Sequence, residues 1–154
     1  WFCSISLGPI SILRGTPFIS YCDFIKFVFE MRVSADLGMM PGLLGCDECY
    51  RSDVPLYFLI KQGIFLCDEH MQTRVLYPNK YNIEITPGMF EAIRFVCLSE
   101  LDRIFSFRLS EDALKKLGKI SELYAQEHFE RHFRTLDFYH SISASAQYED
   151  NKNE

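Results

Sequence analysis

The sequence predicts a mainly helical domain with an inserted, zinc-clasped β-hairpin, and two observations lead to this fold class. First, two pairs of metal-binding residues, Cys46 with Cys49 and Cys67 with His70, are separated by seventeen residues. Second, apolar residues recur at steps of three and four on both sides of this insert, as they do in amphipathic helices. A length of 154 residues with 48% hydrophobic content is enough for one domain with its own core.

The N-terminal part of the chain changes character near residue 20. Residues 1–20 contain Gly8-Pro9 and Thr16-Pro17 and are predicted to be an irregular remnant or linker. The helical domain is expected over residues 21–140, beginning with a helix from about Ser20 to Leu37 that ends before Gly38 and Pro41. Its predicted core-facing residues are Phe24, Phe27, Val28, Met31 and Ala35.

The insert, residues 46–70, has the features of a metal-bound hairpin. Residues 54–60 and 64–66 are short apolar runs around a turn that contains Gly63, which is typical of two paired strands. Four soft or borderline donors are the set that zinc binds in a closed structural site. Three thiolates and an imidazole suit zinc better than an iron–sulfur cluster. We therefore expect one structural zinc ion, and its predicted ligands are Cys46, Cys49, Cys67 and His70.

A disulfide between some of these cysteines, or the vestige of an ancestral metal site, stays open as an alternative to a bound ion. A catalytic ion is disfavoured, because the four donors leave no obvious open position. The sequence also lacks the pattern of the zinc deaminases, an HxE motif followed by PCxxC. The predicted ion would therefore fold the insert without taking part in chemistry.

Two further helices are predicted after the insert. Thr86 and Pro87 supply an N-cap and a first-turn proline for a helix that continues to about residue 99 or 101. After an apolar connector at residues 104–107, Ser110 caps the longest helix, whose pattern continues to Phe138. Its predicted buried stripe consists of Leu114, Leu117, Ile120, Leu123 and Tyr124. Residues 141–154 are predicted to be a disordered tail.

Composition and charge exclude several classes of protein. A net charge of −5 disfavours a chain that binds nucleic acid through an overall positive charge. Six cysteines without a framework spacing indicate a reducing compartment, so we expect a cytoplasmic protein. No apolar run reaches the roughly eighteen residues of a membrane span. An enzyme is the least supported class, because the sequence has no phosphate loop, nucleophile elbow or convincing carboxylate pair.

The last helix carries cations that are candidates for contacting nucleic acid or an acidic peptide. These residues are Lys115, Lys119, Arg131 and Arg134. Residues 108–134 hold six cations against five acids, so a solvated helix face is the favoured interpretation. His128 and His132 lie four residues apart, but without the glutamate of an HExxH motif they are interpreted as packing or capping residues.

Over about residues 24–142, several motifs follow one another along the chain in the same order as in a known family. They are residues 29–41, the Cys46 and Cys49 pair, residues 63–67, residues 104–110, the stretch from Leu123 to Phe133, and residues 135–138. In this order they resemble the C-terminal domain of the bacterial DNA repair and recombination mediator RecO. In that family the ligands are commonly four cysteines, and His70 takes the fourth place here. Family members begin with an OB-fold, which residues 1–23 are too few to form, so an N-terminally truncated chain is expected.

The resemblance implies a non-enzymatic role in DNA repair and homologous recombination. It implies binding to single- and double-stranded DNA, mainly through the OB-fold, strand annealing, and loading of RecA together with the partner RecR, in the cytoplasm at the nucleoid. The helical domain would offer a site to the acidic, aromatic-ended tail of single-strand-binding protein, which needs an apolar socket rimmed by cations. The alternative is a zinc-ribbon nucleic-acid-binding factor of transcription or translation, for which the hairpin offers mainly Arg51 and Lys61.

Overall fold

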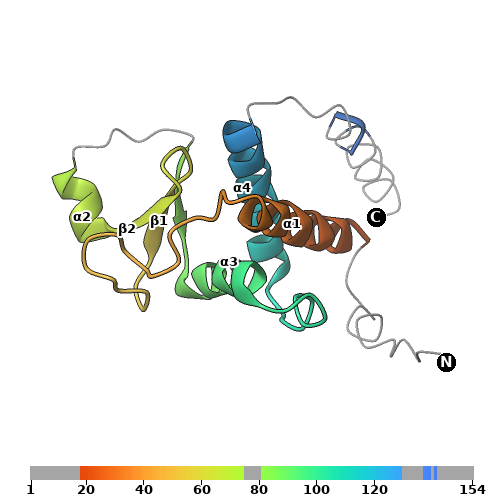
Figure 1. Ribbon diagram of the computed structural model, residues 1–154, viewed down its shortest axis with the longest axis horizontal. Helices are drawn as coiled ribbons and strands as arrows, with labels where there is room; N and C mark the ends of the chain where they lie inside the picture. The colour runs from red at the N-terminus through yellow and green to blue at the C-terminus, as the bar shows by residue number, and fades with distance from the viewer. Residues whose placement is uncertain (1–17, 75–80, 130–136, 140, 142–154) are drawn as a thin grey trace, which may run out of the picture.

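The computed structural model describes residues 18–74, 81–129, 137–139 and 141. Three long helices and a small sheet make up this part of the chain (Figure 1). The helices are α1 (Phe18–Asp36), α3 (Pro87–Leu98) and α4 (Glu111–Phe129), and the short helix α2 (Asp68–Thr73) follows the second strand. The strands are β1 (Leu56–Leu59), β2 (Ile64–Cys67) and β3 (Asn82–Ile85). The prediction of a mainly helical domain with an inserted β-structure is confirmed.

The β-structure is larger than the predicted hairpin. As expected, β1 and β2 pair antiparallel, with Leu56 opposite Cys67, and Gly63 has a φ of +67° in the turn between them. The third strand, β3, pairs antiparallel with the other edge of β1 and gives the order β2-β1-β3. This strand was not predicted from the sequence. An isolated two-stranded hairpin is marginally stable in water, so β3 adds pairing that the hairpin needs.

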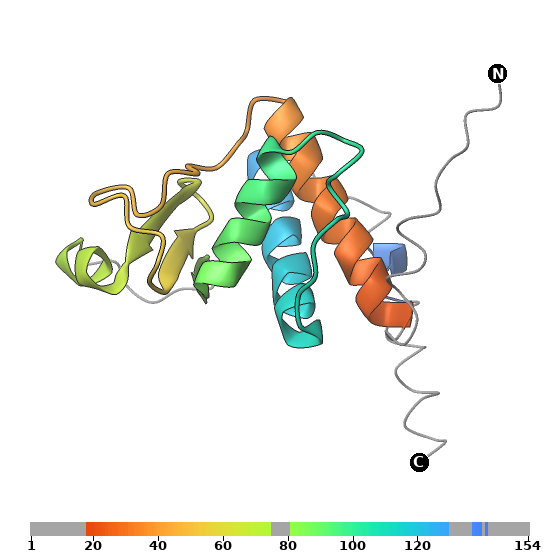
Figure 2. The same cartoon turned by 90° about the horizontal axis from the view of Figure 1, so that it is seen from below.

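Helix α1 packs against α4 and α3, and its start differs slightly from the expected one. It begins at Phe18, so residues 18–20, which were predicted to belong to the irregular remnant, are helical. Phe27 and Met31 of α1 are fully buried, as are Leu117 and Ile120 of α4. The predicted stripes of both helices therefore meet in the core. In Figure 2 the sheet lies on one side of α3 and α4, and α1 lies on the other.

A half-buried polar network joins α1 to α4. The Lys26 Nζ lies 3.2 Å from the Glu30 carboxylate and 2.9 Å from the Glu122 carboxylate. It also donates to the Gly118 carbonyl oxygen at 3.0 Å, and Ser121 Oγ donates to Glu30 at 2.6 Å. Buried charges are tolerated only when they are paired and hydrogen-bonded, and this network meets that requirement.

An aromatic column connects the sheet to the helices. Phe58 of β1 stacks on Phe65 of β2 at 4.3 Å and on Tyr124 of α4 at 5.4 Å between ring centroids. Phe65 meets Phe90 of α3 edge-on at 5.0 Å. Tyr124 Oη donates to the Met39 carbonyl oxygen at 3.0 Å. Such stacked and edge-to-face pairs add to the stabilisation that burial provides, so the sheet and the helices share one core.

Both predicted helix caps are present. Thr86 Oγ1 accepts a hydrogen bond from Met89 N at 3.3 Å, with Pro87 as the first residue of α3. Ser110 Oγ accepts from Ala113 N at 3.4 Å at the start of α4. Each cap satisfies a backbone donor that a helix leaves unpaired in its first turn.

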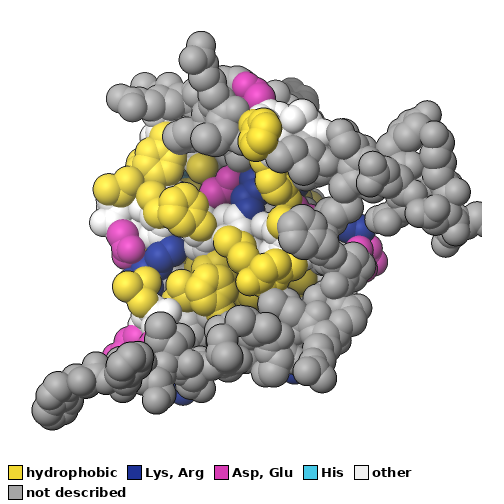
Figure 3. Space-filling model, turned by 90° about the vertical axis from the view of Figure 1, so that its right-hand side faces the viewer, with side chains coloured by type: hydrophobic (Ala, Val, Ile, Leu, Met, Phe, Trp, Pro, Cys, Tyr) yellow, Lys and Arg dark blue, Asp and Glu magenta, His cyan; other side chains and the backbone are white. Residues whose placement is uncertain are grey.

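Some predictions lie outside the described residues. These are residues 1–17, residues 130–136 of the expected long helix with Arg131 and Arg134, and the tail at 142–154. Residues 137–139 are helical. Figure 3 shows the face turned away from the sheet, where apolar side chains gather around a few charged ones. No helix in the described part of the chain is long and apolar enough to span a membrane.

Candidate metal centre and the surrounding surface

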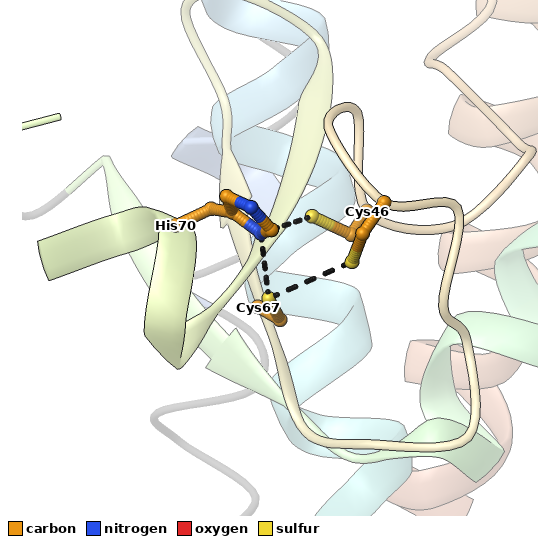
Figure 4. Close-up of side chains that lie close together, drawn as sticks. Cys46, Cys67 and His70 are labelled. Carbon is orange, nitrogen blue, oxygen red and sulfur yellow. Dashed lines mark hydrogen bonds between the residues drawn. The ribbon is translucent and has the colours of Figure 1, made fainter. Parts of the chain in front are cut away.

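The four predicted ligands lie together. The Cys46, Cys49 and Cys67 sulfur atoms and a His70 ring nitrogen are all within 4.8 Å of one another. Cys67 Sγ lies 3.1 Å and Cys46 Sγ 3.5 Å from His70 Nδ1 (Figure 4). Cys49 Sγ lies 3.9 Å from Cys67 Sγ. Donors around a tetrahedral zinc ion would be about 3.5–3.8 Å apart, given its usual bond lengths. The cluster therefore has the dimensions and donor chemistry to hold a metal ion.

Cys46 is positioned by a segment that runs beside β2. Gly42 N donates to Gly63 O at 2.7 Å, and Asp47 N donates to Phe65 O at 2.7 Å. Cys46 forms a parallel bridge with Phe65 between these two bonds. The segment thereby covers the free edge of β2, which would otherwise leave backbone groups unpaired. It also holds Cys46 in the plane of the sheet, next to the end of β2 where Cys67 lies.

The loop from Cys46 to Arg51, here called the knuckle, is closed by its own backbone. Tyr50 N donates to Cys46 O at 2.8 Å, and Cys46 N donates to Arg51 O at 2.9 Å. At Gly45, with a φ of +111°, a Cβ would lie only 2.7 Å from Arg51 O, so this position requires glycine. Tyr50 has a φ of +60°. A left-handed backbone costs a residue other than glycine about 1–2 kcal/mol.

Cys67 and His70 come from the junction of β2 and α2. Cys67 is the last residue of β2 and the N-cap of α2, and His70 lies within the helix three residues later. A helical turn after a strand therefore brings both donors to one side. Helix α2 was not predicted, although Asp68 and Glu69 in its first turn are the acids that a helix N-terminus favours.

The electrostatics of the centre favour a thiolate at Cys46. Burial raises the pKa of this thiol, but hydrogen bonds from the backbone of Cys67, Cys49 and Glu48 outweigh it and lower the pKa to about 6. The thiolate is the form that binds metal. Arg74 adds a link between the two halves of the site, because it pairs with Asp47 and Glu48 of the knuckle.

The predicted basic contacts are not part of this centre. Lys115 pairs with Glu111 at 2.8 Å, and Lys119 lies exposed one turn further along α4. Arg131 and Arg134 lie outside the described residues. The ion pair of Lys115 is what a solvated helix face would show. A contact of Lys115, Lys119, Arg131 and Arg134 with nucleic acid or an acidic peptide stays a prediction.

His128 packs as the sequence suggested. Its ring stacks on Tyr124 with 4.0 Å between ring centroids, and its Nδ1 lies 3.0 Å from the Tyr124 carbonyl oxygen. His132, the other member of the pair, lies outside the described residues. His128 therefore extends the aromatic column at its α4 end.

A cavity lies beside α3 and is here called the α3 pocket; it was not predicted from the sequence. Its volume is about 550 Å³. Its lining includes Phe95, Leu98 and Phe107, with Arg94 and Arg108 contributing cations. Glu91 also lines it and lies 3.6 Å from Arg94. The connector at residues 104–107 was predicted to be apolar, but only the folded chain shows that residues 107–109 close one side of a pocket.

Comparisons with known proteins agree with this architecture. The family model described as recombination protein O C terminal matches residues 22–137. The DNA repair protein RecO of Acetivibrio thermocellus is 30% identical over 112 residues, which are 72% of this chain and 43% of that protein. The DNA repair proteins RecO of Bacillus subtilis and Halalkalibacterium halodurans are each 26% identical, over 69% and 75% of this chain.

The matched region is large in this chain but small in its relatives. The chain spans 40–44% of the length of these three curated proteins. No solved structure matches. The family match runs from α1 through the metal centre and past the end of α4. The chain therefore belongs to the RecO C-terminal family.

Proposed function

We propose that this chain is a non-catalytic interaction module of a DNA repair and recombination mediator that acts in the cytoplasm at the nucleoid. Family membership and the RecO relatives support this role. Strand annealing, RecA loading, and binding to RecR and to single- and double-stranded DNA are proposed for the whole protein. For the part described here, the observation that carries the proposal is the α3 pocket.

The α3 pocket has the chemistry of a receptor for an acidic peptide with an aromatic end. Phe95 and Phe107 lie edge-on at 5.6 Å and offer an apolar wall to an inserted ring. Arg94 and Arg108 are both exposed and lie where carboxylates beside that ring could reach them. Charge-assisted bonds from arginine to carboxylate are among the stronger polar contacts. We propose that the pocket binds the tail of single-strand-binding protein.

Titration of a labelled peptide with that tail sequence, followed by fluorescence anisotropy, tests the proposal. Arg108→Glu should weaken binding by about tenfold or more, because it replaces an attractive charge with a repulsive one. Arg103→Glu is the matched control. Arg103 is also exposed and lies five residues before Arg108, but it does not line the pocket. Equal affinities for the two variants would rule out the α3 pocket as the binding site.

We further propose that the metal is one structural zinc ion held by Cys46, Cys49, Cys67 and His70. The support is a set of three thiols and one imidazole whose donor atoms all lie within 4.8 Å of one another. The ion would tie the knuckle to α2 and supply folding free energy. Elemental analysis with a thiol count should give one zinc per chain and protect three of the six cysteines. A folded chain without zinc would refute the assignment.

The alternative role, a zinc-ribbon factor whose knuckle contacts nucleic acid, gains no support from the site. Residues 44–74 contain five carboxylates against three cations. Of these cations, Arg74 pairs with knuckle acids and Arg51 lies 3.5 Å from Asp53. A negatively charged surface repels phosphates, so the knuckle is a poor nucleic-acid contact.

A further inference from the structure

Two large apolar side chains project from the base of the knuckle. Leu44 is 74% exposed and Tyr50 is 65% exposed. Their backbones are neighbours, because Gly45 packs against the Tyr50 and Arg51 carbonyl oxygens and Cys46 N donates to Arg51 O. The two side chains thus extend from one short segment of chain, which is closed by backbone hydrogen bonds and anchored to β2.

Fold stability does not explain Tyr50. Its left-handed backbone favours glycine, and the exposed ring gains little from burial. A strained residue that persists at a surface is a reason to look for a function. Tyrosine is also a side chain that interfaces use often, because it offers a large contact area for few rotatable bonds.

The charges around this apolar pair define the partner. Asp47 and Glu48 are exposed in the same loop, and Asp68 and Glu69 are exposed at the start of α2. Arg74 already lies against Asp47 and Glu48, which shows that this pair of acids accepts a guanidinium group. A divalent ion held by three thiolates and a neutral imidazole would leave the centre with one negative charge. The surroundings of the knuckle are therefore acidic with the metal bound.

We propose that the knuckle surface, formed by Leu44, Asp47, Glu48 and Tyr50, docks a basic segment of a partner protein. An apolar side chain of that segment would pack against Leu44 and Tyr50, and flanking Lys or Arg residues would meet the acids. Complementary charge gives such a contact its specificity. The proposal is independent of the α3 pocket, whose arginines select the opposite charge.

Selection from a random dodecapeptide library displayed on phage tests this proposal, with the zinc-supplemented chain as bait. The selected consensus is then synthesised and titrated. We expect a consensus with an apolar residue flanked by Lys or Arg, and binding that weakens as salt is raised. Tyr50→Gly should reduce the affinity at least tenfold. The same substitution should leave the melting temperature unchanged or raise it, since glycine fits a φ of +60°.

The glycine variant separates docking from folding, because it removes the contact while relieving strain. An equal affinity of Tyr50→Gly and the unaltered chain for the consensus peptide would overturn the proposal. So would selection of no consensus, or of an acidic one that depends on Arg108 and not on Tyr50. A fifteen-residue oligo-dT that binds and loses affinity on Tyr50→Gly would assign the surface to nucleic acid instead.

Discussion

Loss of the proposed zinc ion should destabilise the whole domain and not only the insert. Cys67→Ser is the sharpest perturbation, because Cys67 Sγ lies beside both Cys49 Sγ and His70 Nδ1. An ion present at about a thousand times its dissociation constant stabilises the folded state by about 4 kcal/mol. For a chain of this size each kcal/mol shifts the melting temperature by about 2–4 °C, so the expected loss is about 10 °C.

Thermal unfolding followed by circular dichroism measures this effect for the Cys67→Ser variant and for the unaltered chain with and without a chelator. Helical and aromatic signals should fall together, because Phe58 and Tyr124 stack across the boundary between sheet and helices. Cys22→Ser is the control, since Cys22 lies half-buried on α1 away from the centre. Unchanged melting of Cys67→Ser, together with insensitivity to the chelator, would refute the coupling between metal and fold.

Three further predictions concern polar contacts between elements. Tyr124→Phe removes the hydrogen bond to Met39 O and should cost about 1 kcal/mol in urea unfolding, whereas an unchanged midpoint would show that water replaces the bond. Lys26→Met leaves the Glu30 and Glu122 carboxylates, whose side chains are 10% and 17% exposed, without their cation. We therefore expect a loss of about 3 kcal/mol, and a loss below about 1 kcal/mol would contradict a largely desolvated ion pair. Burial raises the pKa of Glu30 against the opposing effects of Lys26 and Ser121. The folded state then binds this proton more tightly than the unfolded chain, so the contribution of Glu30 to stability should increase as pH falls through the raised pKa. Glu30→Gln should remove that part of the pH dependence, and a pH series with an identical slope for both proteins would exclude it.

The features that the sequence predicted well are local ones. The two predicted ligand pairs each lie on one turn, so their spacing alone indicates that these four residues could meet, and the structure brings them together. The N-caps Thr86 and Ser110 act on backbone groups three residues away. The buried stripes of α1 and α4 follow from the helical period. In each case, the residues that determine the structure are close neighbours in the chain.

The features that were missed depend on distant partners or on very short elements. Strand β3 has four residues and forms only because β1 offers an open edge. Helix α2 has six residues, too few for a periodic pattern. The α3 pocket requires residues 107–109 to pass beside α3, which no local pattern encodes. The positive φ of Tyr50 follows from closure of the knuckle, and its side chain gives no sign of it.

The two proposed docking surfaces have opposite charge but depend on one core. Phe65 accepts a hydrogen bond from Asp47 of the knuckle through its carbonyl oxygen, and its ring meets Phe90 of α3. Phe58 carries the same stack to Tyr124. An acidic peptide would bind the α3 pocket and a basic segment would bind the knuckle, so the two ligands would not compete for one surface. Both surfaces would keep their shape only while this aromatic column is packed. Salt should weaken both contacts, whereas metal removal should weaken the knuckle contact first, because the knuckle is the part that the ion itself would close.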